Sequence, residues 1–140
     1  MKSFRTSIRI AASSSKVWDI LTNLPRWTSW NTTVDKVEGQ AALGAKVTVH
    51  AKSSPGRAFP LKVAEFEAPR RMVWTGGMPL GLFTGKRTYL ISPDGDGVRF
   101  EMDEQFTGLL APLITKSIPD LQPSFDEFAQ CLKLAAEACG

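Results

Sequence analysis

Two charged residues, Arg87 and Glu104, fall on the predicted buried face of a β-hairpin. The segment GKRTYLISPDGDGVRFEMDEQF, residues 85–106, contains two extended runs separated by the turn-rich stretch SPDGDG. If the runs pair outward from that stretch, Gly85 lies opposite Glu104 and Arg87 opposite Met102, which makes the two charged residues diagonal neighbours. An unpaired charge in an apolar interior is costly, so Arg87 and Glu104 must find partners in each other or in a ligand.

Both kinds of partner are consistent with these residue types. In one interpretation the pair is a structural ion pair. In the other, Arg87 binds a carboxylate, phenolate or carbonyl oxygen on an otherwise apolar ligand, because its planar fork matches paired oxygens. Glu104 then orients Arg87 or accepts a hydroxyl proton, Tyr89 adds a phenol, and Trp74 adds an aromatic wall. The remaining candidate ligand-binding residues are apolar: Met102, Phe106, Trp30, Phe125 and Phe128.

Catalysis is the less favoured interpretation. The candidate acid and base groups are Glu104 and Tyr89, since burial favours a protonated carboxyl group that could release its proton to a substrate. Arg87 opposes this role, because a neighbouring cation favours the ionised carboxylate. The sequence shows neither a nucleophile with an adjacent base nor a glycine-rich phosphate loop. A cyclase-like or dehydratase-like enzyme therefore stays as the alternative to a binding protein.

Composition excludes several other classes. At 140 residues the chain is expected to form one domain, residues 1–140. Its formal charge is +3, but the basic residues are scattered, so we expect no nucleic-acid partner. His50, the only histidine, is predicted on the water-facing side of a strand, so we expect no metal and no cofactor. Cys131 and Cys139 share a predicted helix about 12 Å apart, too far for a disulfide, and are interpreted as small buried thiols.

The first residues, MKSFRTSIRI, contain no continuous apolar stretch typical of a signal peptide. No segment approaches the roughly 20 apolar residues that cross a bilayer. We therefore expect a cytoplasmic protein without stable membrane insertion, present as a monomer or homodimer.

Residue periodicity predicts the elements that position these groups. Phe4–Ile10 alternates as a half-buried strand, and Ser13 or Ser14 caps a helix that runs to Leu24. A second short helix follows at 25–30, with Trp27 and Trp30 on one face as core, lid or ligand contact. Further strands are predicted at 32–38, 44–52, 60–67, 71–76, 82–91 and 97–106.

After Gly108 the pattern becomes helical. It predicts a short helix or turn over 109–117, a break, and a long helix from Asp120 or Ser124 to Ala138, with Ser124 and Glu127 as a capping box. The predicted fold class is α+β: a seven-stranded curled antiparallel sheet wrapped around a long C-terminal helix, with two short helices after the first strand. Such a sheet tends to enclose a mostly apolar ligand cavity.

Several ordered motifs resemble a known superfamily. They are Val17-Trp18 with Leu21, Trp30-Asn31, Val37-Glu38-Gly39 with Gly44, the run PRRMVWTG at 69–76, and EQFTGLLAP at 104–112. Together they are similar to the START-like, or SRPBCC, superfamily of helix-grip proteins, and to its polyketide cyclase/dehydrase-like group. The resemblance spans essentially the whole chain and implies a single START-like domain. It implies a hydrophobic-ligand binder, lipid carrier, polyketide cyclase or chaperone co-factor. The group usually has histidine where this chain has Arg87 and phenylalanine where it has Tyr89.

A protein-interaction module is the third class. Its candidate surfaces are a basic patch at Arg57, Arg70 and Arg71, and the apolar residues Trp27 and 78–80. The sequence indicates no exposed apolar patch that supports this class. The glycine-rich stretch GGMPLGLF is expected to form a loop at the cavity entrance, where it would act as a lid.

Overall fold

The computed structural model describes residues 2–52, 56, 58–117 and 120–138. The chain begins with strand β1 (Lys2–Ile10), helix α1 (Ser14–Thr22) and the 3-10 helix η1 (Leu24–Ser29). Six strands follow: β2 (Val34–Gly39), β3 (Lys46–Ala51), β4 (Phe59–Glu67), β5 (Arg71–Met78), β6 (Phe83–Asp94) and β7 (Gly97–Thr107). The chain continues through α2 (Ala111–Ile114), η2 (Thr115–Ser117) and the long helix α3 (Gln122–Ala138).

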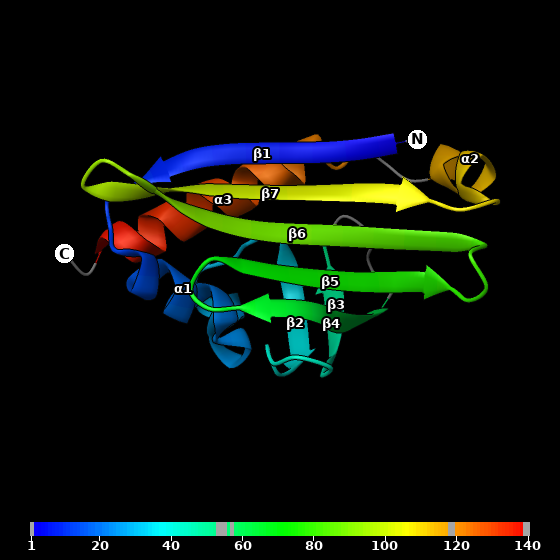
Figure 1. The fold of residues 1–140 in the computed structure, drawn as a ribbon, viewed down its shortest axis with the longest axis horizontal. Coiled ribbons are helices and arrows are strands. Elements are labelled where there is room, and N and C mark those ends of the chain that lie inside the picture. The colour runs from blue at the N-terminus through cyan, green and yellow to red at the C-terminus, as the bar shows by residue number, and fades with distance from the viewer. Residues whose placement is uncertain (1, 53–55, 57, 118–119, 139–140) are drawn as a thin grey trace.

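The seven strands form one antiparallel sheet in the order β1-β7-β6-β5-β4-β3-β2. Figure 1 shows α3 running along one face of this sheet behind β1 and β7, with α1 near the C-terminal half of α3. The core lies between that face and α3, whose buried stripe consists of Phe125, Phe128, Ala129, Leu132 and Ala136. This arrangement confirms the predicted α+β helix-grip fold class.

The β6–β7 hairpin has a different register from the predicted one. Arg87 lies directly opposite Glu104, and Gly85 lies opposite Phe106. The prediction was wrong because it treated SPDGDG as a loop, whereas both strands extend through most of it and leave a two-residue turn at 95–96. Gly95 has a φ of 64°, a conformation that favours glycine, and permits this tight turn.

The helix starts are predicted in part. Ser13 is the N-cap of α1, since its Oγ accepts a hydrogen bond of 3.2 Å from the backbone N–H of Lys16. The expected capping box at Ser124 and Glu127 is wrong, because α3 begins two residues before Ser124. The carboxylate of Glu127 instead accepts a hydrogen bond from the hydroxyl of Thr32, which ties α3 to the segment before β2.

The remaining titratable candidates lie away from the core. His50 contacts Glu38 at 3.1 Å on the outer side of β3. Within the described ranges, no cluster of three or more His, Cys, Asp or Glu residues has metal-binding geometry. Cys131 is a half-buried free thiol, whereas Cys139 and Arg57 lie outside the described residues. No helix in the described part of the chain is long and apolar enough to cross a membrane.

Candidate functional site

The inner face of the sheet carries a row of four side chains that includes both charged candidates. Trp74 on β5 is paired with Arg87 on β6, which is paired with Glu104 on β7, which is paired with Phe4 on β1. Directly paired residues of neighbouring strands point to the same face, so all four project toward α3. Antiparallel pairing therefore brings the two charged residues into direct contact.

Arg87 and Glu104 form an ion pair at the edge of the core. Nε of Arg87 donates a hydrogen bond of 2.7 Å to Oε1 of Glu104. The guanidinium carbon lies 4.9 Å from the centre of the Phe125 ring on α3, close enough for a cation–π interaction. Protein surrounds the pair on most sides, but the Arg87 and Glu104 side chains remain 23% and 15% exposed. The pair is therefore in contact with solvent on one side.

The charge state of Arg87 follows from this environment. Burial alone disfavours the cation, but the negative charge of Glu104 and the nearby oxygen of Tyr89 more than offset that effect and raise the pKa of the guanidinium. Only Nε makes a well-aligned hydrogen bond within the described residues. The Tyr89 oxygen also lies within interaction range of the guanidinium group, so an added oxygen atom would share the remaining guanidinium donors with Tyr89.

Gly85 lies next to the pair on the same face. A Cβ atom on Gly85 would lie 3.4 Å from the Phe106 ring and 3.9 Å from Oε2 of Glu104, which are ordinary contact distances. Phe83, one position further along this face, stacks on Phe106 with ring centres 5.8 Å apart. Gly85 and Phe83 are both half-buried, so the pair borders a partly open apolar end of the inner face.

Tyr89 and Trp74 lie deeper and are fully buried. Their rings are in edge contact with centres 5.0 Å apart, and neither the hydroxyl of Tyr89 nor Nε1 of Trp74 has an aligned hydrogen bond in the described structure. Burial raises the pKa of Tyr89 to about 12, although the Arg87 cation opposes this rise. The phenol therefore stays protonated at neutral pH and can donate a hydrogen bond.

The other predicted site residues pack against one another. Phe128 of α3 contacts the rings of Trp30, Tyr89 and Phe100 at centre distances of 5.5, 6.1 and 6.0 Å. Met102, paired with Tyr89, is also buried. The structure thus brings the predicted candidates onto one inner surface, where Trp74, Tyr89, Met102, Phe106, Phe125 and Phe128 are each at most 6% exposed.

Asn31 is a buried polar residue that sequence reasoning did not select as a site residue. Its Oδ1 accepts hydrogen bonds from the backbone and hydroxyl of Thr33, whereas its Nδ2 has no partner in the described structure. Among the described residues, Nε1 of the adjacent Trp30 is also buried without a partner. In the described part of the chain, the buried side-chain groups without an aligned hydrogen bond are on Trp30, Asn31, Trp74 and Tyr89. Each of them can donate a hydrogen bond, so together they favour an oxygen acceptor.

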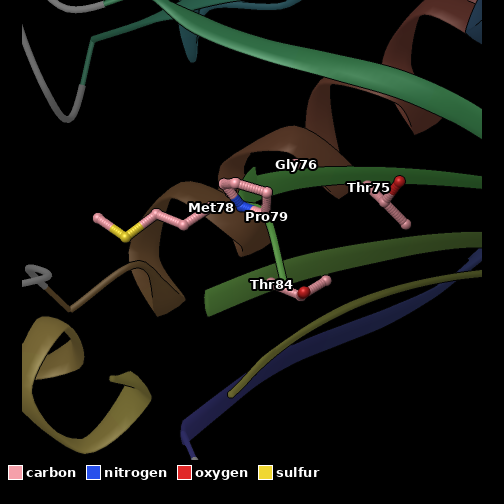
Figure 2. A pocket seen from close by; sticks show the side chains of 6 residues that line it. Thr75, Gly76, Met78, Pro79 and Thr84 are labelled. Atoms are coloured by element: carbon pink, nitrogen blue, oxygen red, sulfur yellow. The ribbon is translucent and has the colours of Figure 1, made fainter. Parts of the chain in front are cut away.

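A shallow pocket lies at the end of β5 and β6. It has a volume of about 320 Å³ and is lined by Thr75, Gly76, Gly77, Met78, Pro79 and Thr84. Figure 2 shows Thr75 and Thr84 on neighbouring strands, with Met78 and Pro79 extending beyond them. The stretch GGMPLGLF, expected to be one loop, is instead the end of β5, a short turn and the start of β6.

Comparison with known families identifies the chain. Residues 1–137 match the family described as "Polyketide cyclase / dehydrase and lipid transport". The chain therefore belongs to this family, which agrees with the START-like resemblance of its sequence motifs. Comparison with curated proteins gave no match.

Solved structures share the fold at low sequence identity. A hypothetical protein from Helicobacter pylori has a TM-score of 0.79 and 16% identity, with 97% of this chain and 88% of that chain covered. A START superfamily protein from Mycobacterium smegmatis has a TM-score of 0.74 and 14% identity, with 99% of both chains covered. A Thalictrum norcoclaurine synthase has a TM-score of 0.74 and 12% identity, covering 99% of this chain and 95% of that one. At these identities the likeness extends to the fold alone.

Proposed function

We propose that the protein binds a small apolar or aromatic molecule with an anionic or oxygen-bearing end, and that Arg87 receives that end. One observation carries the proposal: a guanidinium group lies on the apolar inner face, engages Glu104 through Nε alone, and remains partly exposed. Its terminal nitrogens are suited to a carboxylate, phenolate or carbonyl oxygen. The apolar part of the ligand would lie against Phe83, Phe106 and Phe125.

Several features support a ligand over a purely structural pair. A buried ion pair is rarely more stabilising than apolar side chains of the same volume, so stability alone does not explain Arg87 and Glu104. Nε1 of Trp74, which is paired with Arg87 across the strands and has no hydrogen-bond partner in the described structure, suits a second oxygen on the same molecule. The compartment is proposed to be the cytoplasm and the functional unit a monomer or homodimer.

The test uses a matched pair of probes, naphthoate and its neutral methyl ester, titrated against the protein by calorimetry. We expect naphthoate to bind the wild type, and the double variant Arg87→Leu/Glu104→Met to bind it roughly tenfold to a hundredfold more weakly, because a charge-assisted contact is lost. The ester should lose less affinity than naphthoate in the double variant, because its neutral carbonyl accepts a weaker hydrogen bond from Arg87. The double variant should keep its fold, since replacing both partners with apolar groups is often neutral.

The control applies the same two substitutions to an ion pair on the outer face, Arg71→Leu/Glu65→Met. Naphthoate binding should not change in this variant. Equal naphthoate affinities in the wild type and the Arg87/Glu104 variant would overturn the proposal and leave the pair structural. Native mass spectrometry of protein from its own host supplies an independent check, because a bound ligand appears as a fixed added mass.

Catalysis of the cyclase or dehydratase type is the second candidate. The observation that favours it is the buried, protonated hydroxyl of Tyr89, held near the Arg87–Glu104 pair. In this alternative Tyr89 donates a proton to a substrate oxygen while Glu104 accepts one. Glu104→Gln and Tyr89→Phe should then abolish turnover of a bound polar ketone and leave its affinity nearly unchanged, whereas a simple carrier shows no turnover in any variant.

A further inference from the structure

One end of the molecule exposes several large apolar side chains. Leu80, Leu109, Leu113 and Met78 are 93%, 82%, 68% and 46% exposed. We call these four residues the leucine rim. Figure 1 shows that the β5–β6 turn and α2, which carry or adjoin these residues, lie at the same end of the molecule.

Backbone contacts join the two segments of the rim. The N–H groups of Leu109 and Leu110 donate to the carbonyls of Gly81 and Leu82, at 3.2 and 2.8 Å. Gly108 lets the strands approach this closely, because a Cβ there would lie 2.6 Å from the Leu82 oxygen. The rim is therefore a built surface whose leucines are presented together, at the end that also holds the turn of Figure 2.

Leu80 itself is held in an unfavourable backbone conformation. Its φ is 62°, in the left-handed region that costs a non-glycine residue about 1–2 kcal/mol. Because the side chain is almost fully exposed, packing within the chain does not compensate this cost. A strained leucine that points into solvent is explained by a contact with another molecule.

Positive charge flanks the rim on the outer face of the sheet. Lys46, Lys62 and Lys86 lie in one row across β3 to β6, with Thr75 between the last two. All three lysines are exposed, and none forms an ion pair within the described residues. We call them the lysine row.

Acidic residues lie further from the rim. The outer-face row behind the lysines contains Glu65 and Asp103 beside Arg5, and the next contains Glu67 and Glu101 beside Arg71, so each of these rows has more acidic than basic residues. Because a row runs across the strands, the lysine row lies parallel to the end of the sheet. Lys86 lies three residues after the start of β6, which places its backbone about 10 Å from the end of the strand next to the leucine rim. A long lysine side chain can span part of this distance and bring its ammonium group closer to the rim.

We propose that this end docks reversibly on the surface of an anionic lipid membrane. The leucine rim enters the interfacial layer, and the lysine row faces the phosphate groups. Apolar side chains flanked by lysines match the chemistry of such a surface. Burial of apolar area and electrostatic attraction to anionic lipids both contribute to the free energy of binding there. Four projecting side chains on two turns form too small an area for a stable protein interface, which buries roughly 800 Å² on each partner. This proposal does not depend on the ligand assigned to Arg87.

Co-sedimentation with vesicles of equimolar phosphatidylcholine and phosphatidylglycerol tests the proposal. Leu80→Asn should weaken binding roughly tenfold, because one leucine no longer leaves water. Asparagine tolerates the left-handed conformation, so the melting temperature should be kept or raised. Lys62→Gln/Lys86→Gln should weaken binding roughly twentyfold, and added salt should reduce the difference.

Matched controls separate the rim from general surface effects. Leu134→Asn removes an exposed leucine from α3, and Lys16→Gln/Arg26→Gln removes the same charge near α1 and η1; both should bind vesicles like the wild type. Absence of binding to the anionic vesicles would overturn the proposal. So would equal losses in the control variants, or self-association abolished by Leu80→Asn and seen by light scattering without lipid.

Discussion

Tyr89 shows how one buried side chain links the site to measurable behaviour. It is the only tyrosine in the chain, it is fully buried, and its hydroxyl lacks an aligned partner in the described structure. Burial disfavours the charged phenolate and raises the pKa of Tyr89 to about 12, above the ordinary value of about 10. The folded chain therefore holds this proton at pH values where the unfolded chain has released it.

This difference predicts an alkaline loss of stability. Between about pH 10 and pH 12 the free energy of unfolding should fall by roughly 1–1.5 kcal/mol per pH unit from Tyr89, because only the folded state still binds the proton. Below pH 10 this contribution is fully present. Urea unfolding of wild type and Tyr89→Phe across this range measures it, since lysine contributions are common to both. Tyrosinate absorbance rising near pH 10 in the folded protein would contradict the prediction.

Sequence alternation identified Arg87 and Glu104 as inner-face residues despite the wrong register. The predicted and observed pairings differ by a shift of two residues, and side chains in a strand return to the same face every two residues. The face was therefore predictable, but the direct partner was not. The partner depends on where the turn closes, which here depends on Gly95 and on the contact of Arg9 with Asp96 at 2.6 Å.

At the scale of elements, two facing glycines shape the open end of the inner face. Gly76 on β5 is paired with Gly85 on β6. The space above Gly76 is filled, because a Cβ there would lie 2.6 Å from the Leu61 side chain and 2.9 Å from the Pro60 carbonyl oxygen. The space above Gly85 is less crowded, because a Cβ there would lie 3.4 Å from its nearest neighbour, the Phe106 ring.

The two glycines should therefore respond differently to alanine. Gly76→Ala should destabilise the protein by about 1–3 kcal/mol, because backbone as well as side chain must move. Gly85→Ala should be neutral or stabilising by up to about 1 kcal/mol, since the strand conformation suits alanine. Thermal unfolding compares the two variants. Equal destabilisation would show that the space beside Glu104 is as crowded as that beside Leu61.

Strands and helices were predictable from periodicity, whereas their ends depended on local contacts. Each predicted strand has a counterpart, but β6 reaches Asp94 and so ends three residues later than expected. Helix α3 begins at Gln122, between the two predicted starts, and the carboxylate of Asp120 accepts a hydrogen bond from the backbone N–H of Gln122, at 3.1 Å. In the sequence, Asp120 and Ser124 are equally good helix starts, and residue periodicity does not choose between them.

For the whole molecule, sheet order predicts a gradient of local stability. Strands β6 and β7 are interior strands, each paired with a neighbour on both sides, and their inner faces pack against α3. Strand β2 is an edge strand with an irregular register against β3. Backbone amides in β6 and β7 should therefore exchange with solvent only on global unfolding, and those in β2 and β3 should exchange earlier. Hydrogen-exchange mass spectrometry measures this order, and slower exchange in β2 than in β6 would contradict it.

Whether an inward-facing side chain lines a pocket or fills the core depends on the packing of the whole molecule. Trp74, Phe125 and Phe128 were correctly predicted to face inward, yet sequence alone left open whether they border a space or fill one. Their contacts depend on how closely α3 approaches the sheet, which is set by distant pairs such as Thr6 with Asp126 at 2.9 Å. No periodic pattern encodes that distance.

The close packing of the tryptophans gives the molecule an optical property. The Trp27 ring stacks on Trp74 with centres 5.5 Å apart and meets the edge of Trp30 at 5.7 Å. At such separations the strong far-ultraviolet transitions of the indole rings couple, which produces paired bands of opposite sign in the far-ultraviolet circular dichroism spectrum. Those bands persist only while η1 and β5 keep their relative positions, so their loss reports a rearrangement of the interior.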